Sequence, residues 1–234
     1  MGQFLHEFFN PLDFLRSAPQ VWNGFLFNLK LMVVAEAFIL VLALALAIVR
    51  GLPGRGAAPL RWLAIAYTDV FRGTPLLLVL FMVQGFATLN YAGLSSDTLF
   101  RNGAIALILV YTAYVTEVYR AGIESVHPSQ RMAARSLGLS YMQTMRYVVL
   151  PQAIRRVVPP LLNDFIGLQK DTVLITVIGL TEALAAANFF QSDYANFTGL
   201  TVTAVFFIFL TIPLARFTDH IIKEREKRER AQGV

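Results

Sequence analysis

"LMVVAEAFILVLALALAIV", residues 31–49, contains one ionisable side chain, Glu36, among otherwise apolar residues. A helix needs about 20 mostly apolar residues to cross the hydrocarbon core of a bilayer, so this run has the composition of a transmembrane helix. The rest of the chain agrees: 56% of its 234 residues are hydrophobic, 15% are charged, and the mean hydropathy is +0.57. Such a composition indicates a membrane protein rather than a soluble globular domain.

Five segments are long and apolar enough to be spans, and neither an internal repeat nor a soluble domain separates them. We therefore expect an all-α, polytopic membrane protein with a single transmembrane domain over residues 1–234. The longest loop covers about residues 121–156. The expected spans cover about residues 22–50, 60–89, 103–121, 158–179 and 198–221.

Basic residues gather on one side of these spans. Arginine and lysine residues surround the first short loop (50–61) and occupy the long loop (120–156) and the C-terminal tail (216–230). The loops on the other side carry only Arg16 and Arg101. Because cytoplasmic loops carry the excess of basic residues, we expect the N-terminus outside and both the long loop and the C-terminus in the cytoplasm.

Within the long loop, residues 129–151 predict two short helices joined by a tight turn. Ser129 is suited to cap a first helix over residues 130–137. Gly138 is suited to the left-handed conformation that ends such a helix.

The second helix of this pair is expected to begin at Ser140. Gln143, three residues later, completes a capping box with that serine. Leu150-Pro151 is expected to end the helix, because proline interrupts helical hydrogen bonding. The two helices would form a compact helix–turn–helix with an apolar stripe.

Three functions are open to such a pair. A DNA-binding helix–turn–helix has a similar pattern, but tethers to membrane spans at both ends leave this one too little reach for a major groove. An amphipathic pair could rest on the lipid surface. A compact pair could instead insert into a groove on a cytoplasmic partner.

The loop resembles the signature of bacterial ABC importer permeases, E-A-A-x3-G-x9-I-x-L-P. The anchors of that signature correspond here, at the family's spacing, to Met132, Ala133, Ala134, Gly138, Val148, Leu150 and Pro151. Val148 conservatively replaces the usual isoleucine. Met132 replaces the usual glutamate, which would stand three residues after Ser129 and complete a capping box. We therefore expect a slightly less stable first helix, with docking intact.

The resemblance extends over most of residues 67–184. "FRGTPLLLVLF" (71–81) is similar to the R-G-T-P-L-L stretch of polar amino-acid uptake permeases. "LQKDTVLITVIGLTEAL" (168–184) is similar to their K-D-T-S-L-x-x-x-I-G-x-x-E-L segment, with Val173 in place of the usual serine. The chain is identified as a member of this histidine/glutamine permease-like family, which implies the type I ABC importer permease fold.

Membership implies a transmembrane subunit that works with a second permease chain (the same or homologous), a cytoplasmic ABC ATPase dimer and an extracytoplasmic substrate-binding protein. ATP and Mg²⁺ would be used by the ATPase, and this chain would bind no cofactor. The sequence agrees, since it has no G-x-x-x-x-G-K-[ST] loop to hold ATP phosphates. The residues expected to couple the permease to the ATPase are Ser129, Met132, Ala133, Ala134, Gly138, Ser140, Leu150 and Pro151.

Polar residues inside the expected spans are candidates for a translocation path, because charge in a bilayer is costly and usually faces a polar interior. Gly73 and Pro75 interrupt the second span, and a broken helix can expose backbone groups to a polar solute. Asp171 needs a partner on another helix, for which Arg72 is the candidate. The same charges could instead be structural links between helices. The path candidates are Asp69, Arg72, Gly73, Thr74, Pro75, Asn163, Lys170, Asp171 and Thr172.

These observations predict a permease subunit that moves a polar amino acid inward across the bacterial cytoplasmic membrane and catalyses no reaction itself. No metal site is expected, because the chain has no cysteine and its three histidines are scattered. Nucleic acid is not an expected partner. Two alternatives stay open. A stand-alone secondary transporter or channel for a small polar solute would transport without an ATPase, and a non-transporting scaffold would leave the buried charges without a purpose.

Overall fold

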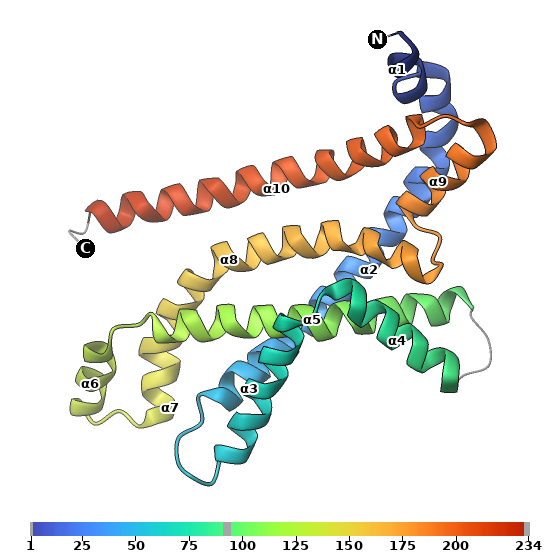
Figure 1. Ribbon diagram of the computed structural model, residues 1–234. Coiled ribbons are helices and arrows are strands. Elements are labelled where there is room, and N and C mark those ends of the chain that lie inside the picture. Colours follow the sequence, from blue (N-terminus) through green and yellow to red (C-terminus); the bar gives the residue numbers. More distant parts are fainter. Residues whose placement is uncertain (1, 91–94, 232–234) are drawn as a thin grey trace. The chain divides into compact units, whose positions relative to one another are not determined.

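A computed structural model of the chain describes residues 2–90 and 95–231, and every regular element within those ranges is a helix (Figure 1). In chain order the elements are α1 (Gly2–Phe8), α2 (Pro11–Arg50), α3 (Ala58–Gly73), α4 (Leu76–Asn90), α5 (Ser96–Glu124), α6 (Pro128–Ser136), α7 (Tyr141–Thr144), the π-helical turn η1 (Met145–Val149), α8 (Leu150–Asp171), the 3₁₀ helix η2 (Thr172–Ile178), α9 (Ala183–Tyr194) and α10 (Thr198–Ala231). The predicted all-α architecture is confirmed.

Three stretches are individually long and apolar enough to cross a membrane: residues 2–50, α5 and residues 198–225. Two further helix pairs, each interrupted by a short break, meet the same criterion when each pair is counted as one span. These pairs are α3 with α4, and residues 141–178 with α9. By length and composition, residues 2–90 and 95–231 therefore contain three to five candidate spans. The predicted span limits and the sidedness of the termini stay predictions.

Helix α2 begins well before the predicted first span. Pro11 stands at its first position, where the missing N–H and the fixed φ of proline are favourable. The side-chain oxygen of Asn10 accepts a hydrogen bond from the Leu12 N–H at 3.0 Å, which caps the helix. Local capping chemistry thus starts the helix about three turns earlier than hydrophobicity alone predicts.

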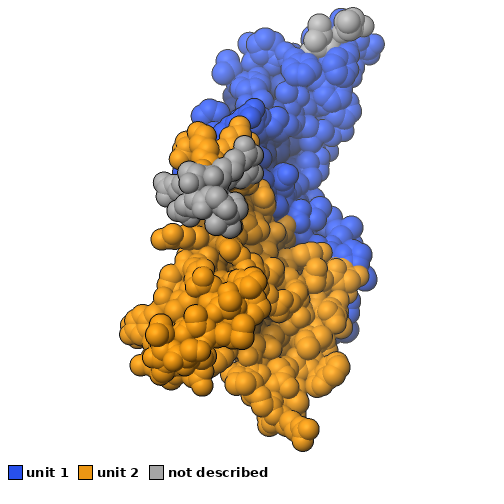
Figure 2. Space-filling model, turned by 90° about the vertical axis from the view of Figure 1, so that its left-hand side faces the viewer, with its two compact units in different colours: residues 1–37, 75–108, 165–217 blue, residues 38–74, 109–164, 218–234 orange. Residues whose placement is uncertain are grey.

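The chain forms two compact units, each assembled from three separate stretches of sequence (Figure 2). Unit 1 consists of residues 1–37, 75–108 and 165–217. Unit 2 consists of residues 38–74, 109–164 and 218–234. The long helices α2, α5, α8 and α10 each contribute one part to each unit.

The core of unit 1 is built where α2, α9 and α10 meet. Val21 and Phe25 of α2 pack with Ala183 of α9 and Val202 of α10. A Cβ added at Gly24 would lie 2.5 Å from the backbone nitrogen of Ala183, so only glycine fits there. Small residues at this crossing allow the helix backbones to approach closely, as is common in membrane proteins.

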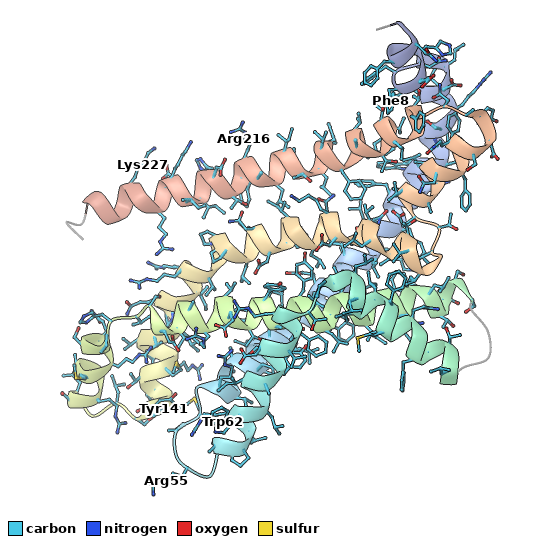
Figure 3. The ribbon with its side chains drawn as sticks, viewed as in Figure 1. Phe8, Arg55, Trp62, Tyr141, Arg216 and Lys227 are labelled. Carbon is cyan, nitrogen blue, oxygen red and sulfur yellow. The ribbon has the colours of Figure 1, made fainter. Side chains whose placement is uncertain are left out.

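Helix α1, which the sequence did not reveal, is fastened to the start of α10 within unit 1. The Phe197 N–H donates to the carbonyl of Glu7 at 2.9 Å, and the Thr201 hydroxyl donates to the carbonyl of Phe8 at 2.7 Å. The rings of Phe8 and Phe197 stack with centroids 5.0 Å apart (Phe8 is labelled in Figure 3). These contacts satisfy carbonyl groups at the end of α1 that helical bonding leaves free.

The core of unit 2 lies where α5 ends and α8 begins. Val126, Val149 and Ala153 form a buried cluster there. A Cβ added at Gly122 would lie 2.1 Å from a methyl carbon of Val157, so the two helices touch at this glycine. In the chain, the helix pair α6–α7 lies between α5 and α8, the two helices that make this contact.

Candidate functional site

Helix α6 is capped differently from the prediction. Pro128 is its first residue, and His127 is the N-cap, whose ring nitrogen Nδ1 accepts the Ser129 N–H at 3.2 Å. The prediction that Ser129 caps this helix is therefore wrong, because the favourable first position of Pro128 moves the start forward. The third helical residue is Gln130, so Met132 lies beyond the capping-box position. The stability loss expected from Met132 thus has no structural basis.

The turn between α6 and α7 confirms the left-handed conformation predicted for Gly138. This residue has φ +81°, in the left-handed region. The Gly138 N–H donates to the carbonyl of Arg135 at 3.0 Å, and the Leu139 N–H donates to the carbonyl of Ala134 at 3.2 Å. These two bonds form a Schellman motif, which fixes the direction in which the chain leaves α6.

The predicted capping box at Ser140 is also confirmed. The Gln143 N–H donates to the Ser140 hydroxyl at 3.2 Å, and the Ser140 N–H donates to the Gln143 side-chain oxygen at 2.8 Å. Both helix ends facing the turn are therefore satisfied by local bonds. Local hydrogen bonds therefore define the turn that joins α6 to α7.

Leu150-Pro151 does not end the second helix, so that prediction is wrong. The helix continues through η1 into α8, in which Leu150 is the first residue and Pro151 the second. A proline inside a helix removes one N–H and crowds the carbonyl four residues back, here that of Tyr147. The wider π-helical turn at residues 145–149 accommodates the ring at that point.

The outer surface of the α6–α7 pair carries large apolar side chains among polar ones. Leu137 is 82% exposed and Met142 is 70% exposed, and the side chains of Met132 and Tyr141 are exposed beside them (Tyr141 is labelled in Figure 3). Ala134, in contrast, is buried on the inner side of the pair. Exposed apolar side chains on a rigid element are typical of a surface that docks onto a partner.

The break predicted in the second span is present. Helix α3 ends at Gly73, Thr74 is extended with φ −102° and ψ 128°, and α4 begins after Pro75. The residue before a proline is driven out of the helical region, which explains the extended Thr74. The Thr74 hydroxyl donates to the carbonyl of Val70 at 2.7 Å and so satisfies one group that the break frees.

Glu117 of α5 organises a charged cluster that the sequence analysis missed. Its Oε1 atom forms an ion pair with Arg50 and lies 3.7 Å from Nη1 of Arg72, and its Oε2 atom lies 2.8 Å from Nη2 of Arg120. Arg50 also donates to the Thr68 hydroxyl at 3.1 Å. The signal was available, because Glu117 is an ionisable residue within the predicted third span.

Arg72 and Glu117 line a cavity of about 560 Å³ within unit 2. Its other charged lining residues are Arg156, Asp164 and Arg225. The Arg72 guanidinium lies 6.0 Å from the centre of the Tyr114 ring. Of the predicted path residues, only Arg72 lines this cavity.

The remaining path candidates have separate surroundings. Asp69 and Asn163 in unit 2 are exposed. In unit 1, Lys170 is exposed and Thr172 is buried, where its hydroxyl accepts the Asn28 amide at 3.2 Å. The predicted pairing of Asp171 with Arg72 stays a prediction. Within residues 2–90 and 95–231, no three histidine or acidic side chains form a group that could hold a metal ion.

A second carboxylate missed by the sequence analysis, Glu182 of unit 1, caps α9. Its two oxygens accept the N–H groups of Leu184 and Ala185, each at 2.9 Å, and the side chain is fully buried. Beside it, the Asn28 side-chain oxygen accepts the Ala183 N–H at 3.1 Å. A carboxylate at a helix N-terminus interacts favourably with the helix dipole, so this group fixes α9 against α2.

Known proteins are similar to this chain in both sequence and architecture. It is 37% identical over 211 residues to the probable glutamine ABC transporter permease protein GlnM of Bacillus subtilis (strain 168), covering 88% of this chain and 93% of that protein. It is 36% identical over 192 residues to the arginine transport system permease protein ArtQ of the same organism, with 81% and 84% covered. A solved structure described as an amino acid ABC transporter with histidines matches with a TM-score of 0.82 and 30% identity, over 91% of this chain and 97% of that one.

Residues 43–227, which include the broken α3–α4 pair and the α6–α7 pair, match the family described as Binding-protein-dependent transport system inner membrane component. Both relatives are named as permease proteins, and a permease subunit of this kind is not itself an enzyme. The resemblance drawn from the loop signature is therefore confirmed. This chain belongs to the family of binding-protein-dependent transport system inner membrane components, as a multi-pass permease subunit of an ABC transporter.

Proposed function

We propose that this chain moves a polar amino acid inward across the bacterial cytoplasmic membrane, as one of two permease chains of an ATP-driven importer. An extracytoplasmic binding protein delivers the amino acid, and a cytoplasmic ATPase dimer uses ATP and Mg²⁺. The substrate class follows the relatives, whose names assign them glutamine and arginine. The observation that carries the proposal is the hydrogen-bonded α6–α7 pair with its exposed apolar side chains, which the predicted orientation puts in the cytoplasm.

The packing of unit 2 supports a coupling role for this pair. The pair stands in the chain between the end of α5 and the start of α8, which touch at Gly122 and Val157. Arg131 of α6 donates to the carbonyl of Ile123, and Arg156 of α8 donates to the carbonyl of Ser125. A displacement of α6–α7 by an ATPase would therefore move α5 and α8 together, because closely packed elements transmit strain.

We propose that polar residues of the broken spans take part in translocation. They are Asp69, Arg72, Gly73, Thr74, Pro75, Asn163, Lys170, Asp171 and Thr172. Broken helices offer backbone groups to a polar solute at membrane depth. Thr172 differs from the other candidates because its hydroxyl is already hydrogen-bonded to the Asn28 amide and to the carbonyl of Gln169. We assign it a positioning role at the start of η2.

The test is uptake into proteoliposomes that hold the permease with its ATPase. Labelled glutamine, arginine, glutamate and leucine are offered outside, with and without the binding protein, and with ATP or ADP inside. We expect accumulation of at least one of the three polar amino acids, only with ATP and the binding protein, and none of leucine. Accumulation without the ATPase would support a stand-alone transporter instead, and absence of uptake for all three would reject the substrate class.

A further inference from the structure

The ion-pair cluster around Glu117 carries an inference that deepens the proposed function and rests on it. We propose that Arg50, Thr68 and Glu117 form a clamp that fixes α3 to α5. A movement of α6–α7 is then passed to the break at Gly73–Pro75, where α3 ends. Arg50 and Glu117 are thus positioning residues for transport, because they hold the helix that leads to the break and do not touch the amino acid.

The clamp joins helices α2, α3 and α5 within unit 2. Arg50 is the last residue of α2, Thr68 lies in α3 and Glu117 lies in α5. One nitrogen of Arg50, Nη1, donates to the Thr68 hydroxyl at 3.1 Å and also forms the ion pair with Oε1 of Glu117. The Arg50 side chain is only 13% exposed and Thr68 is fully buried. Charge-assisted bonds in such poorly solvated surroundings are stronger than surface ion pairs, so they can hold two helices against each other.

The clamp lies close to the break in α3. Thr68 stands about one and a half helical turns before Thr74, the extended residue of the break. Between them, Arg72 lies 3.7 Å from Glu117, and the Tyr114 hydroxyl of α5 donates to the Arg72 carbonyl at 3.4 Å. The division between unit 2 and unit 1 falls directly after Thr74. A short extended segment at such a division is where a hinge absorbs backbone rotation.

At its other end, the connection reaches the α6–α7 pair through α5. Glu117 lies about two helical turns before the end of α5 at Glu124. Arg131 of α6 donates to the carbonyl of Ile123 in the last turn of α5. A displacement of α6 therefore shifts the end of α5, and Glu117 with it, because closely packed elements transmit strain. The clamp carries that shift to α3 and so to the break.

The first arm of the test measures coupling rather than stability. Proteoliposomes with the permease–ATPase complex and the binding protein are assayed for amino acid taken up per ATP hydrolysed. A purely structural defect lowers both rates in proportion and leaves this ratio unchanged. Arg50→Lys keeps the charge but lacks the guanidinium fork, and Thr68→Val keeps the shape but lacks the acceptor. We expect each substitution to lower the ratio at least about twofold.

Thr88→Val is the matched control for Thr68→Val. The Thr88 hydroxyl donates to the carbonyl of Gln84 in its own helix at 2.9 Å, as the Thr68 hydroxyl does to Ile65 at 2.8 Å. Within residues 2–90 and 95–231, however, no arginine donates to Thr88. Arg155→Lys, at an exposed arginine of α8, is the control for Arg50→Lys. Both controls should keep the wild-type ratio, and a wild-type ratio in either clamp variant would overturn the proposal.

The second arm follows the two helices directly. Because the chain has no cysteine, nitroxide labels can be attached through Trp62→Cys in α3 and Glu124→Cys in α5, whose side chains are exposed (Trp62 is labelled in Figure 3). With the clamp intact, we expect the same distance between the labels without nucleotide and with ATP plus vanadate, because α3 and α5 move together. With Thr68→Val added, the distance should differ between the two states. A changed distance with the clamp intact, or an unchanged one with Thr68→Val, would overturn the proposal.

Failure of this inference is distinguishable from failure of the proposed function. A wild-type complex that drives ATP-dependent uptake, together with clamp variants that keep its coupling ratio, would overturn the clamp alone. A wild-type complex that takes up no polar amino acid would overturn the proposed function. If Arg50→Lys does not assemble, Thr68→Val and the label distances measured with the clamp intact decide.

Discussion

At the scale of single residues, each oxygen of the Glu117 carboxylate contacts a different arginine side chain, and the glutamate side chain is only 17% exposed. Removing one partner of a poorly solvated ion pair is costly because the remaining charge loses its compensation. Glu117→Gln keeps the size of the side chain and removes its charge. We expect a loss of about 3 kcal/mol of folding stability, which corresponds to a melting temperature lower by on the order of 10 °C.

The control for this substitution is Glu124→Gln in the same helix. Glu124 pairs with Arg120 but its side chain is 59% exposed, so we expect a loss below about 0.5 kcal/mol. The measurement is thermal unfolding of the purified permease in detergent. Equal melting temperatures for the two variants would show that the Glu117 cluster does not stabilise unit 2.

Gly138 makes a second prediction at this scale. Its φ of +81° penalises any residue with a Cβ, although no atom lies within 4 Å of where that Cβ would be. The penalty is therefore purely conformational, about 1–2 kcal/mol. We expect it to change the direction in which the chain turns from α6 to α7. We expect Gly138→Val to reach the membrane in normal amounts but to retain less ATPase on purification.

The matched control is Gly56→Ala, at a glycine that has equal open space but no positive φ. This variant should retain ATPase like the wild type. Membrane abundance and the ATPase-to-permease ratio are measured in parallel on both variants. Full retention of ATPase by Gly138→Val would refute the docking role of the α6–α7 turn.

At the scale of helices, Gly122 and Gly24 differ in whether a second substitution should restore the stability that an alanine substitution removes. A Cβ at Gly122 would meet a methyl carbon of Val157 at 2.1 Å, whereas a Cβ at Gly24 would meet backbone atoms of residues 182 and 183 at 2.5 Å. We expect both alanine substitutions to destabilise the protein by about 1–3 kcal/mol or more. Adding Val157→Ala should rescue Gly122→Ala, because the obstructing atom is then removed.

No side-chain change near Gly24 can provide such a rescue, because the obstruction is backbone. The comparison is made on thermal unfolding of the single variants, the Gly122→Ala, Val157→Ala double variant and Val157→Ala alone. Failure of the double variant to regain stability over Gly122→Ala would mean that α5 and α8 do not meet at this point.

The helices also show which features a sequence can predict. The Gly138 turn and the Ser140 capping box were predictable because each depends on residues within a few positions of one another. The prediction that Ser129 caps α6 was wrong because the adjacent Pro128 favours an earlier helix start. The prediction that Pro151 ends the second helix was wrong because a π-helical turn accommodates the proline ring. Helix α9 was missed because its N-cap is Glu182, which is not one of the usual N-cap residues, and because the bond from the Ala183 N–H to Asn28 is a tertiary contact.

The charged cavity of unit 2 could be predicted from the sequence only in part, because its residues are far apart in the chain. Arg72 was predicted as a path residue at a helix break and as the candidate partner of Asp171, and the break itself was correct. Glu117, Arg156 and Asp164, which line the same cavity, lie on α5 and α8, and no periodicity in the sequence indicates that these helices bring them together. Hydrophobicity predicts which segments are helical in the membrane, but the convergence of polar groups depends on how those helices pack.

At the scale of the whole molecule, the distribution of basic residues predicts which side each loop faces. The chain has no cysteine, so single cysteines give an unambiguous test. A cysteine in place of Ser140 should be protected from an impermeant thiol reagent in intact cells, and one in place of Ser95 should react. Reaction of the Ser140 site from outside would reverse the predicted topology.

The central claim is that ATP hydrolysis in a partner drives this permease through the α6–α7 surface. The most direct measurement compares ATP-driven amino-acid uptake by vesicles that hold either the wild-type complex or a permease with Leu137→Asp and Met142→Asp, two changes confined to exposed side chains. We predict ATP-dependent accumulation by the wild type, and normal membrane insertion but neither bound ATPase nor uptake for the variant. Undiminished uptake by the variant, or uptake by the wild type after its ATPase is removed, would contradict the account.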